Sequence, residues 1–159
     1  MEKRKFYVMC GLPGSGKSTW ARKHFADKLP IVSRDEVRFK LVREDEDYFS
    51  HEDEVFIQFI NEIAEWSLQH DVVIDATHIN RGSRRKLLNA LTFKCGENIE
   101  VYFIWMNMLL ATCKERNMLR EGRARVPDEA LANMWNRMQI PHKSEYGKPI
   151  IKGIWFVEE

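Results

Sequence analysis

Residues 11–18 carry the clearest chemical pattern in the sequence, Gly-Leu-Pro-Gly-Ser-Gly-Lys-Ser. They match the phosphate-loop pattern G-x-x-x-x-G-K-[ST] in full, with a β-rich run before them and a helix-like segment after them. Gly14 and Gly16 allow backbone conformations that turn N–H groups toward an anion, and the start of the following helix adds its positive end. Lys17 would supply a cation to the β- and γ-phosphates, and Ser18 a hydroxyl for Mg²⁺. The pattern predicts binding of a nucleoside triphosphate; the alternative is a Gly-rich turn with an incidental lysine.

Binding a triphosphate does not say what happens to it. A kinase, a GTPase switch, a mechanical ATPase and a sensor that does not hydrolyse the nucleotide all use such a loop. The N-K-x-D motif that reads the base in Ras-type GTPases does not occur in the sequence. Mechanical ATPases need chains longer than these 159 residues. Both observations favour a small kinase.

Asp35 and Arg38 follow the second expected strand, within Ser-Arg-Asp-Glu-Val-Arg at 33–38. Asp35 would accept a proton from an acceptor hydroxyl as general base. Arg38 lies one helical turn further along the same face, where it would hold an anionic group such as a phosphate. The alternative is that Asp35 only caps a helix and Arg38 is a solvated surface charge.

Asp75 follows the apolar run Val72-Val73-Ile74. A carboxylate at the end of a strand is suited to hold Mg²⁺, usually through water. His78 lies in the same loop, where a lone histidine more often makes structural hydrogen bonds than acts as a catalyst. A basic cluster then follows: Arg81, Arg84, Arg85 and Lys86. It would either track a phosphate backbone or form a solvated helix face.

Cationic side chains also crowd the segment before Val126 and Pro127: Lys114, Arg116, Arg120, Arg123 and Arg125. Arg116 and Arg120 are four residues apart, so they share one helix face. An arginine brought over the phosphates on closure stabilises the charge of the transition state. We expect an Arg-rich helical lid over approximately residues 114–140; an ordinary helix surface paired with neighbouring glutamates is the alternative.

Short apolar runs alternate with helical patterns along the whole chain. Strands are expected at 5–10, 31–33, 72–74, 99–106 and 150–157, and helices at 16–26, 35–41, 52–70, 83–91, 109–120 and 127–139. The alternation predicts a parallel sheet covered on both faces. In such folds ligands bind outside the carboxyl ends of the strands, where the candidate residues lie. The five tryptophans are expected to fill the core, and a stacking platform for bases is the alternative for Trp135.

The composition narrows the class of protein. Hydrophobic residues make up 44% and charged residues 31%, which is typical of a globular chain. The net charge of +1 argues against a protein that coats nucleic acid, although it leaves room for a local basic groove. Three separated cysteines argue against a disulfide scaffold or a zinc site and suit a reducing compartment. With no signal peptide or apolar span of about 20 residues recognisable, we expect one cytoplasmic domain over residues 1–159, with no membrane association and no obligate protein partner.

Four segments in order resemble the polynucleotide 5′-hydroxyl kinase family, namely the kinase domain of the phage polynucleotide kinase/phosphatase and the bacterial RNA-repair kinases. They are 11–21, 33–38, 74–80 and 116–127. The resemblance covers most of the chain. The Arg-Asp-x-x-Arg segment and the Arg-rich lid ahead of Val-Pro are more specific than the phosphate loop. The resemblance implies an adenylate-kinase-like, three-layer P-loop NTPase of the α/β class. It also implies that the protein transfers the γ-phosphate of ATP, with Mg²⁺, to a 5′-hydroxyl end of RNA or DNA.

The resemblance also implies roles for the matching residues. The expected catalytic residues are Lys17, Asp35, Arg38 and Arg120. The expected nucleotide-binding residues are Gly14, Ser15, Gly16, Lys17, Ser18, Thr19, Arg116, Arg120 and Arg123. The expected metal ligands are Ser18 and Asp75. Arg38 would hold the phosphate 3′ to the acceptor nucleoside.

The sequence departs from the family in three places. The family often carries Asn where His78 stands. The lid segment is one residue longer than in the phage enzyme, which leaves Arg120 and Arg123 as alternatives for the main lid arginine. An Asp-x-Asp-Gly-Thr phosphatase segment does not occur. Two other functions stay open: a kinase acting on a small-molecule hydroxyl of a sugar, nucleotide or antibiotic, and a nucleotide-binding regulatory module without transfer activity.

Overall fold

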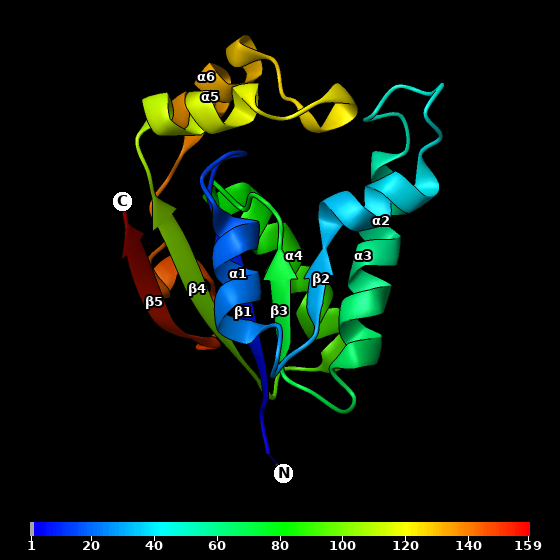
Figure 1. Ribbon diagram of the computed structural model, residues 1–159. Helices are drawn as coiled ribbons and strands as arrows, with labels where there is room; N and C mark the ends of the chain where they lie inside the picture. The colour runs from blue at the N-terminus through cyan, green and yellow to red at the C-terminus, as the bar shows by residue number, and fades with distance from the viewer. Residues whose placement is uncertain (1) are drawn as a thin grey trace.

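Five short runs rich in β-branched and aromatic residues pair into one sheet at the centre of the molecule (Figure 1). The computed structural model describes residues 2–159. The strands are β1 (Arg4–Cys10), β2 (Ile31–Ser33), β3 (Val72–Asp75), β4 (Ile99–Asn107) and β5 (Ile151–Glu158). They lie in the order β2-β3-β1-β4-β5, and each neighbouring pair is parallel. The predicted parallel sheet is confirmed.

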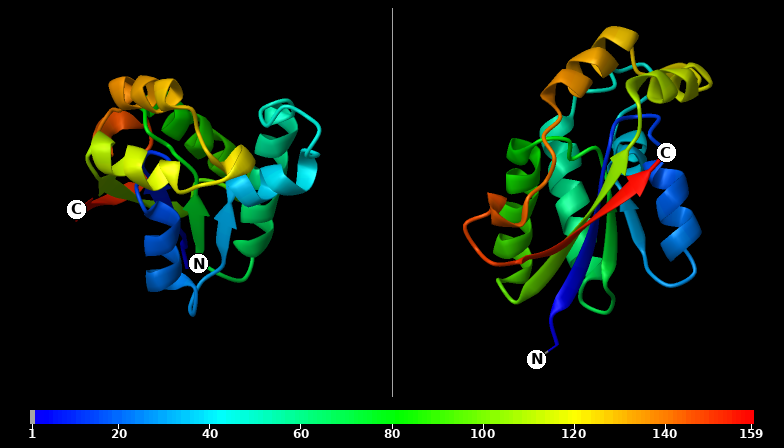
Figure 2. Two further views of the ribbon diagram at one scale, coloured as in Figure 1. Left: turned by 45° about the horizontal axis from the view of Figure 1, so that its top comes forward. Right: turned by 90° about the vertical axis from the view of Figure 1, so that its left-hand side faces the viewer.

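Helices cover both faces of this sheet and cross its upper edge (Figure 2). They are α1 (Lys17–Phe25), α2 (Arg34–Leu41), α3 (Glu52–Trp66), α4 (Arg81–Cys95), α5 (Leu110–Met118) and α6 (Asp128–Arg137), with short 3-10 turns η1 (Gly122–Ala124) and η2 (Lys143–Glu145). α1 lies on one face, and α3 and α4 lie on the other. α5 and α6 extend above the carboxyl ends of the strands, as the expected lid requires. The expected three-layer arrangement of the α/β class is confirmed.

The central strand β1 divides the core between the two layers of helices. Phe6, Val8 and Cys10 pack on the side of α3 and α4, whereas Met9 packs with Ala21 of α1. This is the alternation that a strand imposes on successive side chains. All four residues of β3 are buried, as expected of a strand covered on both faces. The two cores hold the carboxyl ends of β1, β2 and β3 at fixed positions.

Several predicted boundaries were wrong for identifiable reasons. α3 ends at Trp66 rather than residue 70, and the Ser67 hydroxyl donates to the carbonyl of Ala64 at 2.7 Å, a local bond that competes with helix continuation. α4 begins before residue 83 because Asn80 and Ser83 form a reciprocal capping box. Pro127 is the N-cap of α6 rather than its first residue.

The prediction that all five tryptophans fill the core was also wrong. Trp105 is 2% exposed, whereas Trp66, Trp135 and Trp155 are 50%, 39% and 45% exposed. Each of these three side chains is still partly buried, as is common for so large a residue. Within residues 2–159, no helix combines the length and apolar character that crossing a bilayer requires.

Candidate active site

The phosphate loop, residues 11–18, joins the end of β1 to the start of α1. Gly14 and Gly16 have φ angles of 83° and 88°, in the left-handed region that glycine adopts without a Cβ penalty. A Cβ built on Gly14 would lie 2.5 Å from the carbonyl oxygen of Cys113 in α5, so the lid helix packs directly on the loop. The Gly11 N–H donates to the carbonyl of Thr77 at 2.8 Å, which ties the loop to the segment after β3. The loop has the conformation of an anion-binding nest at a helix N-terminus.

Lys17 and Ser18 open α1 beneath this loop. Ser18 Oγ donates to Asp75 Oδ2 at 2.6 Å. Asp75 ends β3 and is buried, and its Oδ1 has no hydrogen-bond partner within residues 2–159. A buried carboxylate oxygen left without a partner beside a hydroxyl is the hard-oxygen donor set that Mg²⁺ prefers. The two expected metal ligands therefore lie together and fit a Mg²⁺ ion bound with a triphosphate.

Asp35 and Arg38 lie on α2, which follows β2 without a loop. The side chain of Ser33 caps this helix by accepting from the Glu36 N–H at 3.3 Å. Arg38 Nη1 donates to Asp35 Oδ1 at 2.7 Å, across one helical turn. The Asp35 side chain is 57% exposed, whereas Arg38 is buried. The alternative that Arg38 is a solvated surface charge is therefore wrong.

Glu52, the first residue of α3, holds Arg38 from the other side. Arg38 donates to both carboxylate oxygens of Glu52, at 2.7 and 3.0 Å, and Arg34 donates to Glu52 Oε2 at 3.1 Å. Burial alone would lower the pKa of Arg38, but its hydrogen bonds to Glu52 and Tyr48 outweigh burial and raise it. Burial would likewise raise the pKa of Glu52, but the two arginines hold it below its usual range. Two cations and the two carboxylates of Asp35 and Glu52 thus form a charge-balanced group.

A cavity of about 240 Å³ joins these two parts of the molecule. Its lining includes Lys17, Asp75, Asp35, Arg38, Tyr48 and Arg120. We call the phosphate loop with Asp75 the donor side, and α2 with residues 42–51 and Glu52 the acceptor side. The side chains predicted to hold phosphate, to accept a proton and to bind an anionic acceptor therefore line one cavity.

Two of the three expected lid arginines, Arg120 and Arg123, line this cavity. Arg123 Nη1 also donates to the carbonyls of Val42 and Arg43, at 3.1 and 3.0 Å, which joins the lid to the segment after α2 (Figure 1). Both alternatives for the main lid arginine therefore line the cavity that Lys17 also lines, and Arg123 is in addition bonded to the segment after α2.

Arg116 lies over the phosphate loop from α5. Its Nη1 is 2.9 Å from the position that a Cβ on Gly16 would take. It lines a second cavity of about 470 Å³ together with Ser15, Thr19 and Trp20. Of the predicted nucleotide-binding residues, Lys17, Arg120 and Arg123 thus line the first cavity, and Ser15, Gly16, Thr19 and Arg116 line the second.

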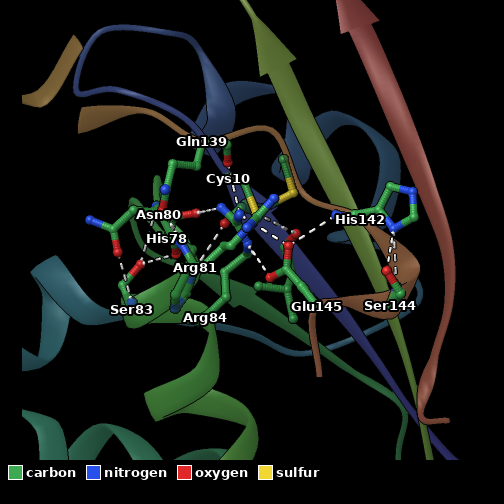
Figure 3. A network of polar contacts seen from close by, with 12 residues as sticks. Cys10, His78, Asn80, Arg81, Ser83, Arg84, Gln139, His142, Ser144 and Glu145 are labelled. Atoms are coloured by element: carbon green, nitrogen blue, oxygen red, sulfur yellow. Dashed lines mark hydrogen bonds and ion pairs between the residues drawn. The ribbon is translucent and has the colours of Figure 1, made fainter. Parts of the chain in front are cut away.

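The basic cluster after β3 is not the continuous charged face that the sequence suggested. Arg84 is fully buried, and it donates to both carboxylate oxygens of Glu145, at 2.7 and 3.2 Å (Figure 3). It also donates to the carbonyls of His78 and Gln139, at 2.9 and 2.8 Å. The prediction that Arg84 tracks a phosphate backbone or lies in solvent was therefore wrong. Arg84 joins the segment after β3 to the chain that leaves the lid.

His78 sits in the same network, with a positive φ of 42°. Its Nδ1 is 3.0 Å from the carbonyl oxygen of Met9, the residue before the last of β1. Burial lowers the pKa of His78 to about 4, so the ring is neutral and donates this hydrogen bond at neutral pH. It acts here as a structural link between β1 and the segment after β3.

Sequence reasoning missed three residues of the site. Glu52 and Tyr48 reach Arg38 and Asp35 only because α2 and α3 fold against each other. Asn117 is buried and bonds both the N–H and the carbonyl of Val126, at 2.9 and 2.6 Å, which closes the lid segment into a loop. The available signal for this last role was helical spacing, because Asn117 lies four residues after Cys113 on the face that α5 buries.

A phosphate loop between a central strand and a helix, on a parallel sheet with helices on both faces, defines the P-loop NTPase class. The sequence matches the family model of the AAA domain over residues 6–141. The chain belongs to this AAA-domain family. A comparison with curated protein sequences finds no match.

Solved structures share the fold. A chain of the Pnkp1/Rnl/Hen1 RNA repair complex matches with a TM-score of 0.67 at 20% identity over 86% of this chain, which spans only 44% of that longer chain. A gluconokinase from Sinorhizobium meliloti 1021 matches with a TM-score of 0.60 at 19% identity, covering 99% of this chain and 84% of that one. A fungal RNA kinase matches with a TM-score of 0.61 at 12% identity, covering 99% and 75%. These likenesses show that the chain shares the P-loop fold of these proteins, and they leave the activity and the acceptor open.

Proposed function

We propose that this protein is an ATP- and Mg²⁺-dependent polynucleotide kinase that transfers the γ-phosphate of ATP to a 5′-hydroxyl end of RNA or DNA. The observation that carries the proposal is the 240 Å³ cavity in which Lys17 of the donor side faces Asp35 and Arg38 of the acceptor side. A phosphoryl transfer needs a cation at the γ-phosphate, a base at the acceptor hydroxyl and a grip on the acceptor, in one place.

The two hydrogen bonds to Asp35 suit it to act as the base. Arg38 Nη1 and Tyr48 Oη both donate to Oδ1, at 2.7 and 3.0 Å, which fixes the carboxylate and leaves Oδ2 for an acceptor hydroxyl. The acceptor hydroxyl passes its proton to Asp35 while the hydroxyl oxygen bonds to the γ-phosphorus. The bond from the γ-phosphorus to the β,γ-bridging oxygen breaks, and ADP leaves.

Charge on the transferring group is balanced by residues of the donor side and the lid. Lys17 and the N–H groups of the phosphate loop hold the β- and γ-phosphates, and Arg120 approaches them from the lid. Mg²⁺ bound with ATP would neutralise charge on the phosphate oxygens, and Ser18 and Asp75 are the residues that would hold it. Arg116 and Thr19 would contact the nucleotide in the adjoining cavity.

The buried arginine on the acceptor side favours an acceptor that carries a phosphate. Arg38 keeps its charge through its bonds to Glu52, and it lines the cavity beside Asp35. A guanidinium is the group best suited to hold a phosphate by paired hydrogen bonds. A phosphate 3′ to the acceptor nucleoside would lie beside the hydroxyl that Asp35 serves.

A small-molecule kinase is the second candidate, favoured by the likeness of fold to the gluconokinase. The charge balance between Arg34, Arg38, Asp35 and Glu52 is also compatible with an uncharged polyol. A regulatory module without transfer would bind ATP but release no ADP with any acceptor.

The test is transfer of labelled γ-phosphate from ATP and Mg²⁺ to a 5′-hydroxyl oligonucleotide, with RNA and DNA side by side. The same oligonucleotide with a 5′-phosphate and the Lys17→Met variant are matched controls. We expect label on the 5′-hydroxyl oligonucleotides and none in either control. Label transferred only to gluconate or another sugar would establish the second candidate instead, and ATP binding without transfer would establish the regulatory module.

A further inference from the structure

Two aromatic rings lie on the acceptor side, and only the hydroxyl of one of them, Tyr48, has a role in the chemistry described so far. Tyr48 and Phe49 lie between α2 and α3, and both line the 240 Å³ cavity with Asp35 and Arg38. Their ring centres are 4.9 Å apart with the rings nearly perpendicular, at 83°. Phe49 is 55% exposed, although Phe is a side chain that proteins usually bury.

The segment that carries these rings is held in place by its own contacts. The Tyr48 hydroxyl donates to Asp35, the Arg43 N–H donates to Glu46 Oε1 at 3.0 Å, and the Ser50 hydroxyl donates to the carbonyl of Asp47 at 2.7 Å. Because these bonds fix the backbone on both sides of Phe49, its ring is presented to the cavity in a defined place. A preformed surface of this kind loses little entropy when it binds.

Neighbouring cations lie against both rings. The guanidinium of Arg38 lies 4.8 Å from the centre of the Tyr48 ring, and that of Arg123 lies 5.8 Å from it. Arg38 also lies 5.3 Å from the centre of the Phe49 ring, which is the more exposed of the two. Phe49 therefore offers a flat apolar surface directly beside the arginine proposed to hold a phosphate.

We infer that Phe49, supported by Tyr48, stacks on a nucleobase at the 5′ end of the acceptor, so that the substrate is recognised as a nucleotide and not as a sugar or alcohol. This inference rests on the proposed function. A group whose hydroxyl meets Asp35 and whose phosphate meets Arg38 is the sugar-phosphate unit of a nucleic acid, and each such unit carries a base. Aromatic stacking accepts every base, because each has a π-face, so the ring selects for a nucleotide without selecting a sequence.

The experiment compares two 5′-hydroxyl oligonucleotides that differ only in the terminal residue. One ends in an ordinary nucleotide, and the other ends in a tetrahydrofuran residue that has the 5′-hydroxyl and the 3′-phosphate but no base. We expect kcat/KM of the wild type to be about tenfold or more higher for the base-bearing acceptor, the effect expected of one base–aromatic stack.

Phe49→Ala should lose this preference by falling about tenfold on the base-bearing acceptor while staying unchanged on the abasic one. Phe49→Trp, which keeps and enlarges the ring, should retain the preference. Phe93→Leu is the matched control, because Phe93 is 86% exposed on α4, outside the cavity lining. It should behave as the wild type with both acceptors.

Two results would overturn the inference while leaving the proposed function intact. One is a wild type that phosphorylates both acceptors equally well. The other is a Phe49→Ala variant that loses the same factor on both, which would mean that the ring only supports the segment around it. A wild type that phosphorylates neither acceptor would overturn the proposed function itself, and the inference with it.

Discussion

The donor side and the acceptor side meet in one cavity but are built differently. The donor side consists of a backbone loop and two strand ends, and it rests on the buried network of His78, Arg84 and Glu145 (Figure 3). The acceptor side consists of side chains joined by ion pairs, with Asp35 57% and Glu52 32% exposed. This difference predicts whether a substitution on each side will lower stability or activity. Damage to the donor side's support should mainly lower stability, and damage to the acceptor side should mainly lower activity.

The largest expected effect is that of Asp35→Asn on transfer. Loss of a general base lowers kcat by about 10²–10⁴-fold, whereas loss of a half-exposed ion pair changes the free energy of unfolding by about 1 kcal/mol or less. ATP binding should persist, because the donor side is untouched. Steady-state transfer and urea unfolding measure the two quantities, with Asp45→Asn as the control, since Asp45 is an exposed carboxylate nearby. Undiminished transfer would remove Asp35 as the base.

Arg84→Met should show the opposite behaviour. It leaves the Glu145 carboxylate buried without its partner and the carbonyls of His78 and Gln139 without a donor. Breaking a buried ion pair from one side costs about 3–5 kcal/mol, which urea unfolding would record as a lower midpoint with an unchanged slope.

The double variant Arg84→Met with Glu145→Leu sharpens this prediction. It removes the uncompensated carboxylate, so it should recover part of the lost stability, but not the part due to the two carbonyls. A double variant less stable than Arg84→Met would show that the ion pair is not what stabilises the network.

His78 should make the donor side's support sensitive to acid. Burial lowers its pKa from the usual 6.5 to about 4, so the unfolded chain binds more protons than the folded one between these values. The free energy of unfolding should therefore fall as pH is lowered through this window, by up to about 1.4 kcal/mol per pH unit and about 3 kcal/mol in all.

His78→Asn should flatten the unfolding curve between pH 6.5 and 4, because asparagine tolerates the positive φ of this position and does not titrate. His51, whose pKa is raised by its hydrogen bond to Glu46, acts with the opposite sign, and the comparison of variant with wild type cancels it. An unchanged slope in the variant would mean that the sensitivity to acid arises elsewhere.

The same contrast explains how much the sequence could predict. The donor side is one contiguous motif whose glycines, lysine and serine need only a strand before them and a helix after them, and the alternation of strands and helices supplied the fold. The acceptor side joins residues 13 and 14 positions apart, Tyr48 to Asp35 and Glu52 to Arg38, and no local pattern marks such pairs.

Arg84 was mistaken for a surface charge although its spacing held a signal. It lies three, four and seven residues before Leu87, Leu88 and Leu91, on the helix face that these leucines bury. The arginine and lysine residues beside Arg84 made the segment resemble an exposed basic cluster, so the buried position was not recognised. Its buried partner, Glu145, is 61 residues away and could only be found in the fold.

The most direct test of the account is whether the acceptor side reads a phosphate through Arg38. The measurement is kcat/KM for a nucleoside 3′-phosphate and for the plain nucleoside, with the wild type and with Arg38→Gln. Because the two acceptors are compared on the same protein sample, a lower folded fraction cancels from their ratio. We predict that Arg38→Gln lowers the value for the 3′-phosphate about 10–100-fold more than the value for the plain nucleoside, which loses only what the bond from Arg38 to Asp35 contributes. An equal fall with both acceptors would contradict the account, because Arg38 would then serve only to position Asp35.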